Sequence, residues 1–518
     1  MLSSIHFSKK SYRSHYKKNT LESVMAEGQS KPLNGADTAW LRMDSPTNLM
    51  IINAMLITEN MRFEDFKHTI INRFLHFPRF LSKPVSKSGQ FYWEKDPYFD
   101  IDSHVKRVAL PAVADKKALQ AYLADQVSIP FDHSKPLWQL LFIENYDHGN
   151  AIIFRVHHSY ADGLALVSVF HSITDASANV APFVHGGASR FHEDGEADSS
   201  STDMNYEWPR YQRAMDNAMN RVDRYSGLAK KISNEGLHIL KDQEALKELL
   251  GDGVKAAAEI AQLATLPADS KKLLKGTLGI RKTCAWSEPI SFDKFYGTAK
   301  MIGCKVNDLL LSCVAGALRE ELLASGAKLD GQKIHVTLPV NIRPADKIDM
   351  GVNPEELGNC FGTVFVPLPI GIDNPIERVY KLKHDMIALK QSLQPALSYA
   401  ILYASGLMPK AVQKTLLESF GNKTSAVLSN VPGSKEPRFI CGAKIKEQMF
   451  WVPQTGDLGL GLSIISYAGQ IQFGLVGDAK LFPKPERIVN RFVAQIDMHR
   501  IDIVASYIED LVQPIMVS

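Results

Sequence analysis

The stretch "FRVHHSYADG" at residues 154–163 decides how the chain is interpreted, because two adjacent histidines there join two different patterns. The residues on its first side, 150–158, are β-branched and apolar, which indicates a buried strand. On its second side, 161–173 carries apolar residues at helical spacing, namely Leu164, Val167, Phe170 and Ile173. The stretch therefore predicts a strand-to-helix turn, with Asp162 as the helix N-cap and Gly163 relieving crowding.

The two histidines allow three interpretations: a metal site, a general base, or incidental residues of the turn. Neighbouring side chains of a strand point to opposite faces, so His157 and His158 do not converge on one ion. The sequence has no cysteine or carboxylate cluster to supply further ligands, and a metal site is therefore not expected. A neutral imidazole, with an ordinary pKa of about 6.5, can accept a proton from a hydroxyl. The local pattern leaves the base and the structural turn both open.

Two regions of alternating strand and helix patterns flank a segment of different composition. In the first region, residues 49–57 predict a buried strand and residues 115–128 predict a helix. The Gly-, Ser- and acid-rich residues 185–205 have little to bury and predict a flexible linker. Residues 206–265, with charged and Ala-rich faces, predict a helical connector.

The α/β pattern resumes near residue 283. The predicted elements are a strand near 284–292, a helix at 308–323, strands at 333–343 and 360–370, and a hairpin at 458–478 turned at "AGQ". We therefore predict an α/β fold with an N-terminal domain of residues 32–185 and a C-terminal domain of residues 283–518. Residues 186–282 would join them as linker and helical connector.

The composition is that of an ordinary soluble enzyme. The 518 residues are 45% hydrophobic and 22% charged, and the formal net charge is only +3. Nothing in this balance indicates a nucleic-acid partner. The five cysteines are odd in number and form no Cys-x-x-Cys pair, so we expect neither a disulfide framework nor a thiolate zinc site. A reducing, cytoplasmic compartment fits best.

Two segments bear on targeting and membranes. Residues 1–31 are basic and lack an apolar core, so they are not a secretory signal. A transit peptide, a basic tail that contacts anionic lipid, and an upstream start ahead of Met25 remain open. The apolar stretch 391–409 is interrupted by Gln, Ser and Pro and is too short to span a bilayer. It predicts a buried helix, with residues 399–408 as the alternative contact with a membrane or lipid droplet.

The spacing His-His-x-x-x-Asp-Gly at residues 157–163 resembles the signature of the CoA-dependent acyltransferase superfamily. That superfamily includes chloramphenicol acetyltransferases, peptide-synthetase condensation domains and plant alcohol acyltransferases. Further short motifs occur in the order found in bacterial-type wax ester synthase/diacylglycerol acyltransferases. They are "PLW" at 136–138, "VND" at 306–308, "NIR" at 341–343, "LGN" at 357–359, "SNVPG" at 429–433 and the opening "LNGADTAWLRMDSPTNLM" at 33–50. The resemblance covers residues 32–515.

The resemblance implies two chloramphenicol-acetyltransferase-like α/β domains with a tunnel between them, entered by the two substrates from opposite ends. His158 would act as the general base, and His157 would support the strand end. A long-chain fatty acyl group would pass from acyl-CoA to a fatty alcohol or a diacylglycerol, without a cofactor or a covalent enzyme intermediate. Asp162 would turn away from the tunnel and pair with an arginine, for which we predict Arg343.

The remaining motif residues have a structural and a functional interpretation each. Asn307 and Asp308 suit an N-cap followed by an acidic first-turn residue, while Asn307 could alternatively donate a hydrogen bond to the oxyanion. In "SNVPG", Ser429 and Asn430 are candidates for substrate or CoA binding. In "PLW", Trp138 is a large aromatic residue beside proline and is expected to serve packing, and Pro136 is likewise given a structural role.

The sequence is also compatible with two rival functions. One is an acyltransferase for a different alcohol. The other is a non-catalytic, condensation-like protein that binds lipid or acts as a scaffold and has kept the motif. A peripheral association with membranes or lipid droplets is expected for the enzyme, because its lipid substrates reside there.

Overall fold

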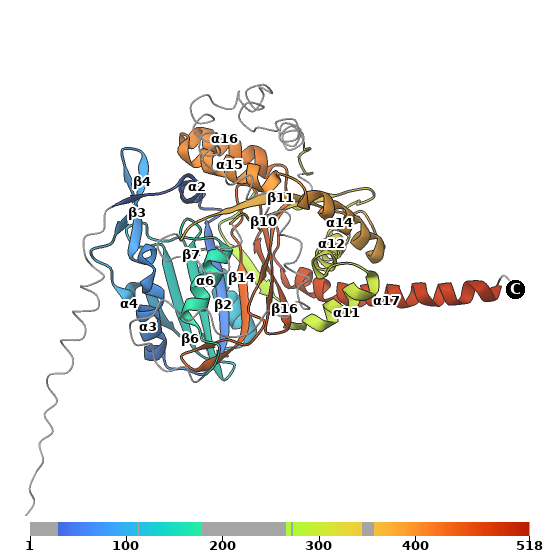
Figure 1. The fold of residues 1–518 in the computed structure, drawn as a ribbon, viewed down its shortest axis with the longest axis horizontal. Helices are drawn as coiled ribbons and strands as arrows, with labels where there is room; N and C mark the ends of the chain where they lie inside the picture. The colour runs from blue at the N-terminus through green and yellow to red at the C-terminus, as the bar shows by residue number, and fades with distance from the viewer. Residues whose placement is uncertain (1–29, 112, 179–265, 271–272, 344–356, 517–518) are drawn as a thin grey trace, which may run out of the picture.

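The computed structural model describes residues 30–111, 113–178, 266–270, 273–343 and 357–516 (Figure 1). The predicted linker and helical connector at 185–265 lie outside the described residues. The same is true of residues 1–29 of the predicted basic extension.

A six-stranded sheet forms the first half of the fold. In spatial order its strands are β13 (Phe439–Ile440), β14 (Ala443–Trp451), β2 (Ile51–Glu59), β7 (Gly149–His157), β6 (Trp138–Tyr146) and β5 (Val105–Val108). The predicted strands at 49–57 and 150–158 are thus confirmed as β2 and β7, which pair antiparallel. A smaller three-stranded sheet lies beside it, in the order β1 (Lys31–Pro32), β4 (Gln90–Lys95) and β3 (Ser82–Lys87).

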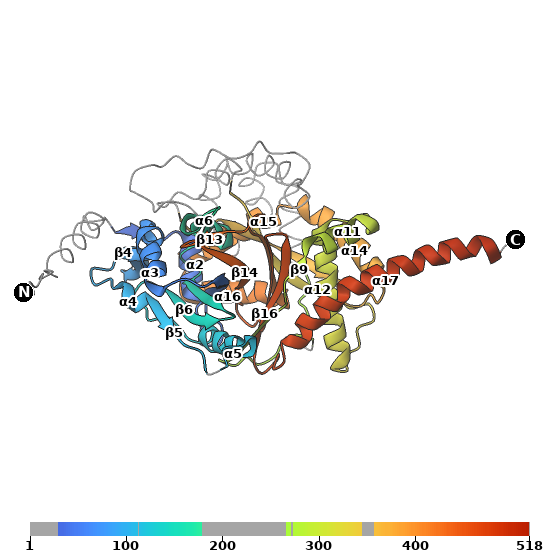
Figure 2. The ribbon, with the colours of Figure 1, turned by 90° about the horizontal axis from the view of Figure 1, so that it is seen from below.

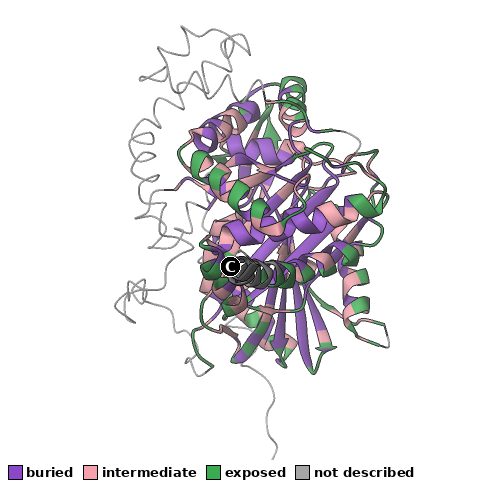
Figure 3. Ribbon diagram, turned by 90° about the vertical axis from the view of Figure 1, so that its right-hand side faces the viewer, coloured by how far each residue is buried: buried purple, intermediate pink, exposed green. Residues whose placement is uncertain are grey.

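Helices cover both faces of the six-stranded sheet. On one face lie α3 (Phe63–Asn72), the 3-10 helices η1 (Phe74–His76) and η2 (Pro78–Leu81), and α6 (Gly163–Ile173). On the other face lies α5 (Lys116–Val127), as predicted for 115–128, and α4 (Ile101–His104) precedes β5. The burial of these sheets between their helices is visible in Figure 3.

A seven-stranded sheet forms the second half. Its order is β11 (Phe361–Leu368), β10 (Ile334–Asn341), β12 (Ala426–Pro432), β15 (Leu460–Tyr467), β16 (Gln470–Asp478) and β8 (Lys282–Trp286), with β9 (Ile290–Ser291) paired to β16. The predicted hairpin is β15–β16, and Ala468 and Gly469 turn it with φ of 47° and 74°. Positive φ at both positions suits a tight hairpin turn.

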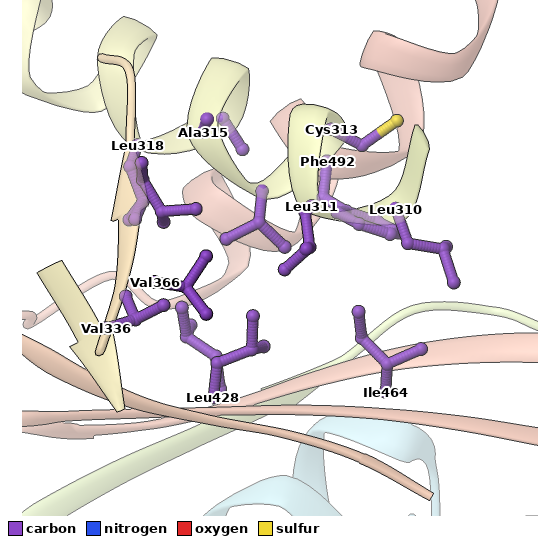
Figure 4. Packing of buried hydrophobic residues seen from close by; sticks show 14 of the residues in the cluster. Leu310, Leu311, Cys313, Ala315, Leu318, Val336, Val366, Leu428, Ile464 and Phe492 are labelled. Carbon is purple, nitrogen blue, oxygen red and sulfur yellow. The ribbon is translucent and has the colours of Figure 1, made fainter. Parts of the chain in front are cut away.

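Four helices cover one face of the seven-stranded sheet: α11 (Phe292–Ile302), α12 (Val306–Ala324), α14 (Pro375–Lys390) and α17 (Glu486–Met516). Leucines of α12 pack on Val336, Val366, Leu428 and Ile464 of the sheet (Figure 4). α17 continues well beyond the body of the protein in Figures 1 and 2.

The chain crosses between the two sheets. After β12 it leaves the seven-stranded sheet, forms β13 and β14 in the six-stranded sheet, and returns as β15. The predicted C-terminal domain of residues 283–518 is therefore not confined to one sheet. β14 ties the halves together through backbone hydrogen bonds to β2.

The apolar stretch 391–409 forms the buried helix α15 (Gln394–Leu407), followed by α16 (Lys410–Gly421). α15 packs on α2 (Gly35–Met43) and β11 near the top of Figure 1. A Cβ added to Gly406 would lie 1.8 Å from the Gly35 carbonyl oxygen, so the two helices touch backbone to backbone. The core-packing interpretation of 399–408 is confirmed for most of the stretch, although Leu407 is 45% exposed.

Among the described helices, none is by itself long and apolar enough to cross a bilayer. α11 and α12 together have the length and composition of a span, but they are bent by 98° where they join.

Candidate functional site

His158 is the first residue after β7, where the two halves of the fold meet. Its backbone N–H donates to the Met50 carbonyl oxygen at 2.7 Å, which extends the β2–β7 pairing by one step. The imidazole stacks on the indole of Trp40 in α2, with ring centroids 4.0 Å apart and planes 8° apart. Phe361, at the start of β11, lies on the other sheet and contacts both rings. The ring is therefore held between elements of both halves.

Asn359 orients the imidazole through a hydrogen bond to Nδ1. Asn359 Oδ1 lies 2.9 Å from His158 Nδ1, and Asn359 Nδ2 donates to the His158 carbonyl oxygen at 2.7 Å and to Asp37 Oδ1 at 2.8 Å. Arg79 Nη1 donates to the second oxygen of Asp37 at 2.8 Å. The described part of the chain offers His158 Nε2 no hydrogen-bond partner.

Burial keeps the imidazole of His158 neutral. Loss of hydration lowers the pKa of His158 to about 4, against the opposing effects of its own backbone carbonyl, of Asp162 and of Asn359. Near neutral pH one ring nitrogen therefore carries a lone pair, and the side chain can accept a proton.

His157 occupies the opposite face of β7 and has a different partner set. Its Nδ1 accepts from the Ser159 N–H at 3.1 Å and lies 2.8 Å from Ser159 Oγ, so the proton belongs on Nε2. That nitrogen faces Asp44 Oδ2 at 3.7 Å, and the residue is fully buried. Although burial raises the pKa of Asp44, His133, His157 and the Met50 N–H together hold it well below its usual range. The supporting role of His157 at the strand end stays a prediction.

The predicted pairing of Asp162 with Arg343 is present. Arg343 Nη2 lies 2.7 Å from Asp162 Oδ2, and Nη1 donates to Oδ1 at 3.0 Å, so the contact is bidentate. The same carboxylate accepts from the N–H of Ala165, which confirms the N-cap, and from the N–H of Cys360. Asp162 thus joins the start of α6 to the end of β10 and to the segment before β11.

One local prediction about α6, the role of Gly163, is wrong. The buried face of the helix consists of Ala165, Val169 and Ile173, so that of the four apolar residues at the predicted helical spacing only Ile173 is buried. The helix is apolar on several sides, so its spacing does not define which side faces the core. A Cβ on Gly163 would meet only Val431 Cγ2, at 3.8 Å, which is ordinary contact. Gly163 therefore does not relieve crowding.

The "VND" and "SNVPG" segments lie against each other. The N-cap position of α12 is occupied by Lys305 rather than the predicted Asn307, and Asp308 accepts from the Lys305 N–H at 3.3 Å. Asn307 Oδ1 instead accepts from Asn430 Nδ2 at 2.9 Å. Ser429 is buried in β12. No direct contact joins these residues to His158 in the described structure, although the contact of Val431 with Gly163 brings β12 to the start of α6.

Trp138 serves packing, as predicted. It is almost fully buried, its Nε1 donates to the Phe80 carbonyl oxygen at 2.7 Å, and its indole stacks on His104. Pro136 is also buried, two residues before the start of β6.

A small pocket of about 10 Å³, room for about one water molecule, lies between the two sheets, and its lining includes Ile51, Asn53, Lys282 and Trp451. His158 does not line it, so the tunnel through the active site stays a prediction. Within the described residues, no three His, Cys, Asp or Glu side chains are grouped as a metal would require.

Three residues that contact His158 or its partners, Asp37, Trp40 and Asn359, have no role among those predicted from the sequence. All three stand in quoted motifs, the opening "LNGADTAW" and "LGN". The sequence offered one signal, a polar residue within each motif, at Asp37 and Asn359. That both residues are buried and that the two motifs meet at His158 is visible only in the fold.

Solved structures define the class of fold. The wax ester synthase/diacylglycerol acyltransferase from Marinobacter aquaeolei VT8 matches with a TM-score of 0.63 and 18% identity, over 91% of this chain and 99% of that chain. The starter condensation domain of rhizomide synthetase, solved with C8-CoA and Leu-SNAC, matches with a TM-score of 0.55 and 12% identity, over 94% and 96%. The fold is therefore the two-lobed α/β fold of condensation domains and acyltransferases.

Sequence comparison narrows this class to a family. Residues 33–310 match the wax ester synthase/diacylglycerol acyltransferase catalytic domain, and residues 357–499 match the WS/DGAT C-terminal domain. The O-acyltransferase WSD of Acinetobacter baylyi is 22% identical over 424 residues, 80% of this chain and 84% of that protein. A probable diacylglycerol O-acyltransferase of Mycobacterium tuberculosis is 24% identical over 426 residues, 80% and 85%. The chain belongs to the wax ester synthase/diacylglycerol acyltransferase family.

Proposed function

We propose that the protein transfers a long-chain fatty acyl group from acyl-CoA to the hydroxyl of a fatty alcohol or a diacylglycerol. Membership of the family supports acyl transfer to an alcohol or diacylglycerol as the class of reaction. The observation that carries the mechanism is a neutral, buried His158 whose Nδ1 is bound and whose Nε2 is not.

The reaction begins when His158 Nε2 accepts the proton of the acceptor hydroxyl. The alcohol oxygen attacks the thioester carbonyl carbon, and its bond to that carbon forms as the carbonyl becomes an oxyanion. Collapse of the tetrahedral intermediate breaks the carbon–sulfur bond, and the CoA thiolate takes the proton back from the imidazolium. A positioned general base contributes roughly 10²- to 10⁴-fold in rate.

Residues of the second half are proposed to bind the reacting groups. Asn307 keeps its amide nitrogen for the oxyanion while its Oδ1 is held by Asn430. One such donor is worth about 3 kcal/mol in the transition state. Ser429 and Asn430 are proposed to contact the acyl-CoA, because their strand reaches the start of α6. Both substrates would reach His158 through a tunnel between the two sheets.

Release of free CoA thiol tests this proposal. Purified protein is mixed with palmitoyl-CoA and either hexadecanol or a diacylglycerol, and thiol release is followed for wild type and His158→Ala. We expect release by wild type with at least one acceptor, and a loss of 10²-fold or more in the variant. No release with either acceptor refutes the lipid acyltransferase. Equal release by His158→Ala removes that residue from its role.

We further propose a peripheral association with membranes or lipid droplets, where the lipid substrates reside. The support is an exposed apolar pair at the junction of α15 and α16, formed by Leu407 and Val412, which are 45% and 38% exposed. Flotation with phosphatidylcholine vesicles that contain triacylglycerol tests it. The double variant Leu407→Glu and Val412→Glu should lose flotation while keeping thiol release with a short, water-soluble acceptor. Undiminished flotation would rule out this surface.

A further inference from the structure

We infer that Asn359 and Asp37 are positioning residues that hold the imidazole of His158 in its Nδ1-protonated form, leaving Nε2 as the reacting nitrogen. The inference rests on the proposed function for its kinetic consequence. Which ring nitrogen of His158 carries the proton follows from the hydrogen bonds alone. The two residues lie far apart in the sequence: Asp37 is within α2, and Asn359 precedes β11 by two residues.

The orientation of the Asn359 amide is fixed by its donors. Nδ2 faces two groups that can only accept, the His158 carbonyl oxygen at 2.7 Å and Asp37 Oδ1 at 2.8 Å. Turning the amide over would place its oxygen against both acceptors. Oδ1 must therefore be the atom 2.9 Å from His158 Nδ1. An oxygen at that distance requires a proton on Nδ1, because the other tautomer would set two lone pairs against each other.

Asp37 is in turn held so that it can only accept. Its side chain is fully buried, and four N–H groups converge on its two oxygens. These donors are the backbone N–H of Asn359 at 3.1 Å, Asn359 Nδ2, Asn34 Nδ2 at 3.1 Å and Arg79 Nη1 at 2.8 Å. On balance the pKa of Asp37 is raised, because burial outweighs the opposing effects of Arg79 and Asn359. A proton on the carboxyl would displace one of the four donors, so the hydrogen bonds favour the ionised form.

The plane of the ring is fixed by the same helix that carries Asp37. Trp40 follows Asp37 by three residues, which puts both side chains on one face of α2. The Trp40 indole lies nearly parallel to the imidazole at 4.0 Å. Rotation of the ring about its own axis would break the Asn359 contact, and tilting would break the stack. α2 therefore sets both the plane of the ring and its tautomer.

Charged groups around His158 do not supply an alternative acceptor for Nδ1. Both oxygens of Asp162 already accept hydrogen bonds, from Arg343 and from the backbone N–H groups of Ala165 and Cys360. His157 is bound to Ser159. The Asn359 oxygen therefore favours the Nδ1-protonated tautomer together with the backbone carbonyl of His158 itself, and Asp37 fixes the orientation of Asn359.

Two measurements test the inference. The first uses protein labelled with ¹⁵N-histidine, in which His158 is assigned by comparison with His158→Gln, and the nitrogen shifts report which ring nitrogen carries the proton. We expect Nδ1–H in wild type and a mixture of tautomers in Asn359→Ala. Nε2–H in wild type overturns the inference whether or not the enzyme transfers acyl groups, so its failure is separate from failure of the proposed function.

The second measurement is steady-state thiol release by Asn359→Ala, Asp37→Asn and the double variant. The control is Asn374→Ala, which removes an asparagine N-cap from α14. We expect kcat to fall about 10- to 100-fold in Asn359→Ala with KM nearly unchanged. The double variant should lose no more than Asn359→Ala, because Asp37 acts through Asn359. Wild-type kcat in Asn359→Ala, or losses that multiply in the double variant and follow the melting temperature, would overturn the inference.

Discussion

Replacing Arg343 with alanine should destabilise the turn that presents His158, because it leaves a buried carboxylate without its cation. The side chains of Asp162 and Arg343 are only 5% and 12% exposed, and their contacts at 2.7 and 3.0 Å form two parallel charge-assisted bonds. In Arg343→Ala, the carboxylate keeps its backbone donors at Ala165 and Cys360.

The magnitude follows from what each variant leaves unpaired. Removing one member of a buried pair costs about 3–5 kcal/mol, and the retained donors place Arg343→Ala near the lower value. Asp162→Asn keeps an oxygen for the helix cap but leaves the guanidinium facing a neutral amide, for which we expect about 2 kcal/mol. The double variant has neither the buried carboxylate nor the buried guanidinium, so no charge is left without its partner. Its loss should therefore fall short of the sum of the single losses by about 2 kcal/mol.

Urea unfolding of the four proteins, followed by circular dichroism, measures these differences from the midpoints and slopes. Thiol release measured in parallel should fall in both single variants, because the cap holds the turn that carries His158. A coupling energy below about 0.5 kcal/mol would mean that the two side chains do not depend on each other. Wild-type stability in Arg343→Ala would refute the reasoning outright.

Three further predictions concern the same region. The pKa of His158, about 4 when folded, lies below the unfolded value of about 6.5, so the unfolded chain binds more protons between these values. Relative to His158→Gln, stability should thus fall by about 3 kcal/mol as the pH drops from 6.5 to 4, and kcat/KM should fall below about pH 4. Asn307→Ala should lower kcat about 10²-fold at unchanged KM; an unchanged kcat would exclude the oxyanion role. Gly406→Ala places a Cβ 1.8 Å from the Gly35 oxygen and should lower both melting temperature and kcat, unlike Gly421→Ala, whose Cβ meets nothing within 4 Å.

Local patterns predicted the elements around the site well. The turn after β7, the Asp162 cap and the β15–β16 hairpin depend on residues within a few positions of one another. The side of α6 that faces the core could not be predicted in this way, because the helix is apolar on several sides. Its orientation depends on the contacts of Asp162 with residues distant in the sequence. The N-cap position of α12 was misplaced by two residues because Lys305 occupies it, although lysine is not a typical cap residue.

Long-range pairing limited what the sequence could reveal about the fold and the site. The exchange of β13 and β14 into the other sheet leaves no local signature, because β14 alternates like any strand. Asp37 and Asn359 likewise stood in recognisable motifs, but each gains its meaning from a hydrogen bond between distant parts of the chain. The family resemblance supplied His158 and the choice of Arg343, whereas the way in which His158 is oriented had to be seen.

The position of α6 shows why the base depends on both halves of the fold. Arg343 binds the cap at its first turn, and Arg438, which precedes β13, donates to the carbonyl oxygens of His171 and Thr174 at its last turn. A cation at the C-terminal end of a helix also interacts favourably with the negative end of the helix dipole. α6 is thus fixed at its first turn by Arg343 of the seven-stranded half, and at its last turn by Arg438, which lies at the edge of its own six-stranded sheet although it comes from the C-terminal part of the sequence. Since the ring of His158 is bound by Asn359 of the second half and stacked on α2 of the first, any change in the docking of the two halves would alter the base itself.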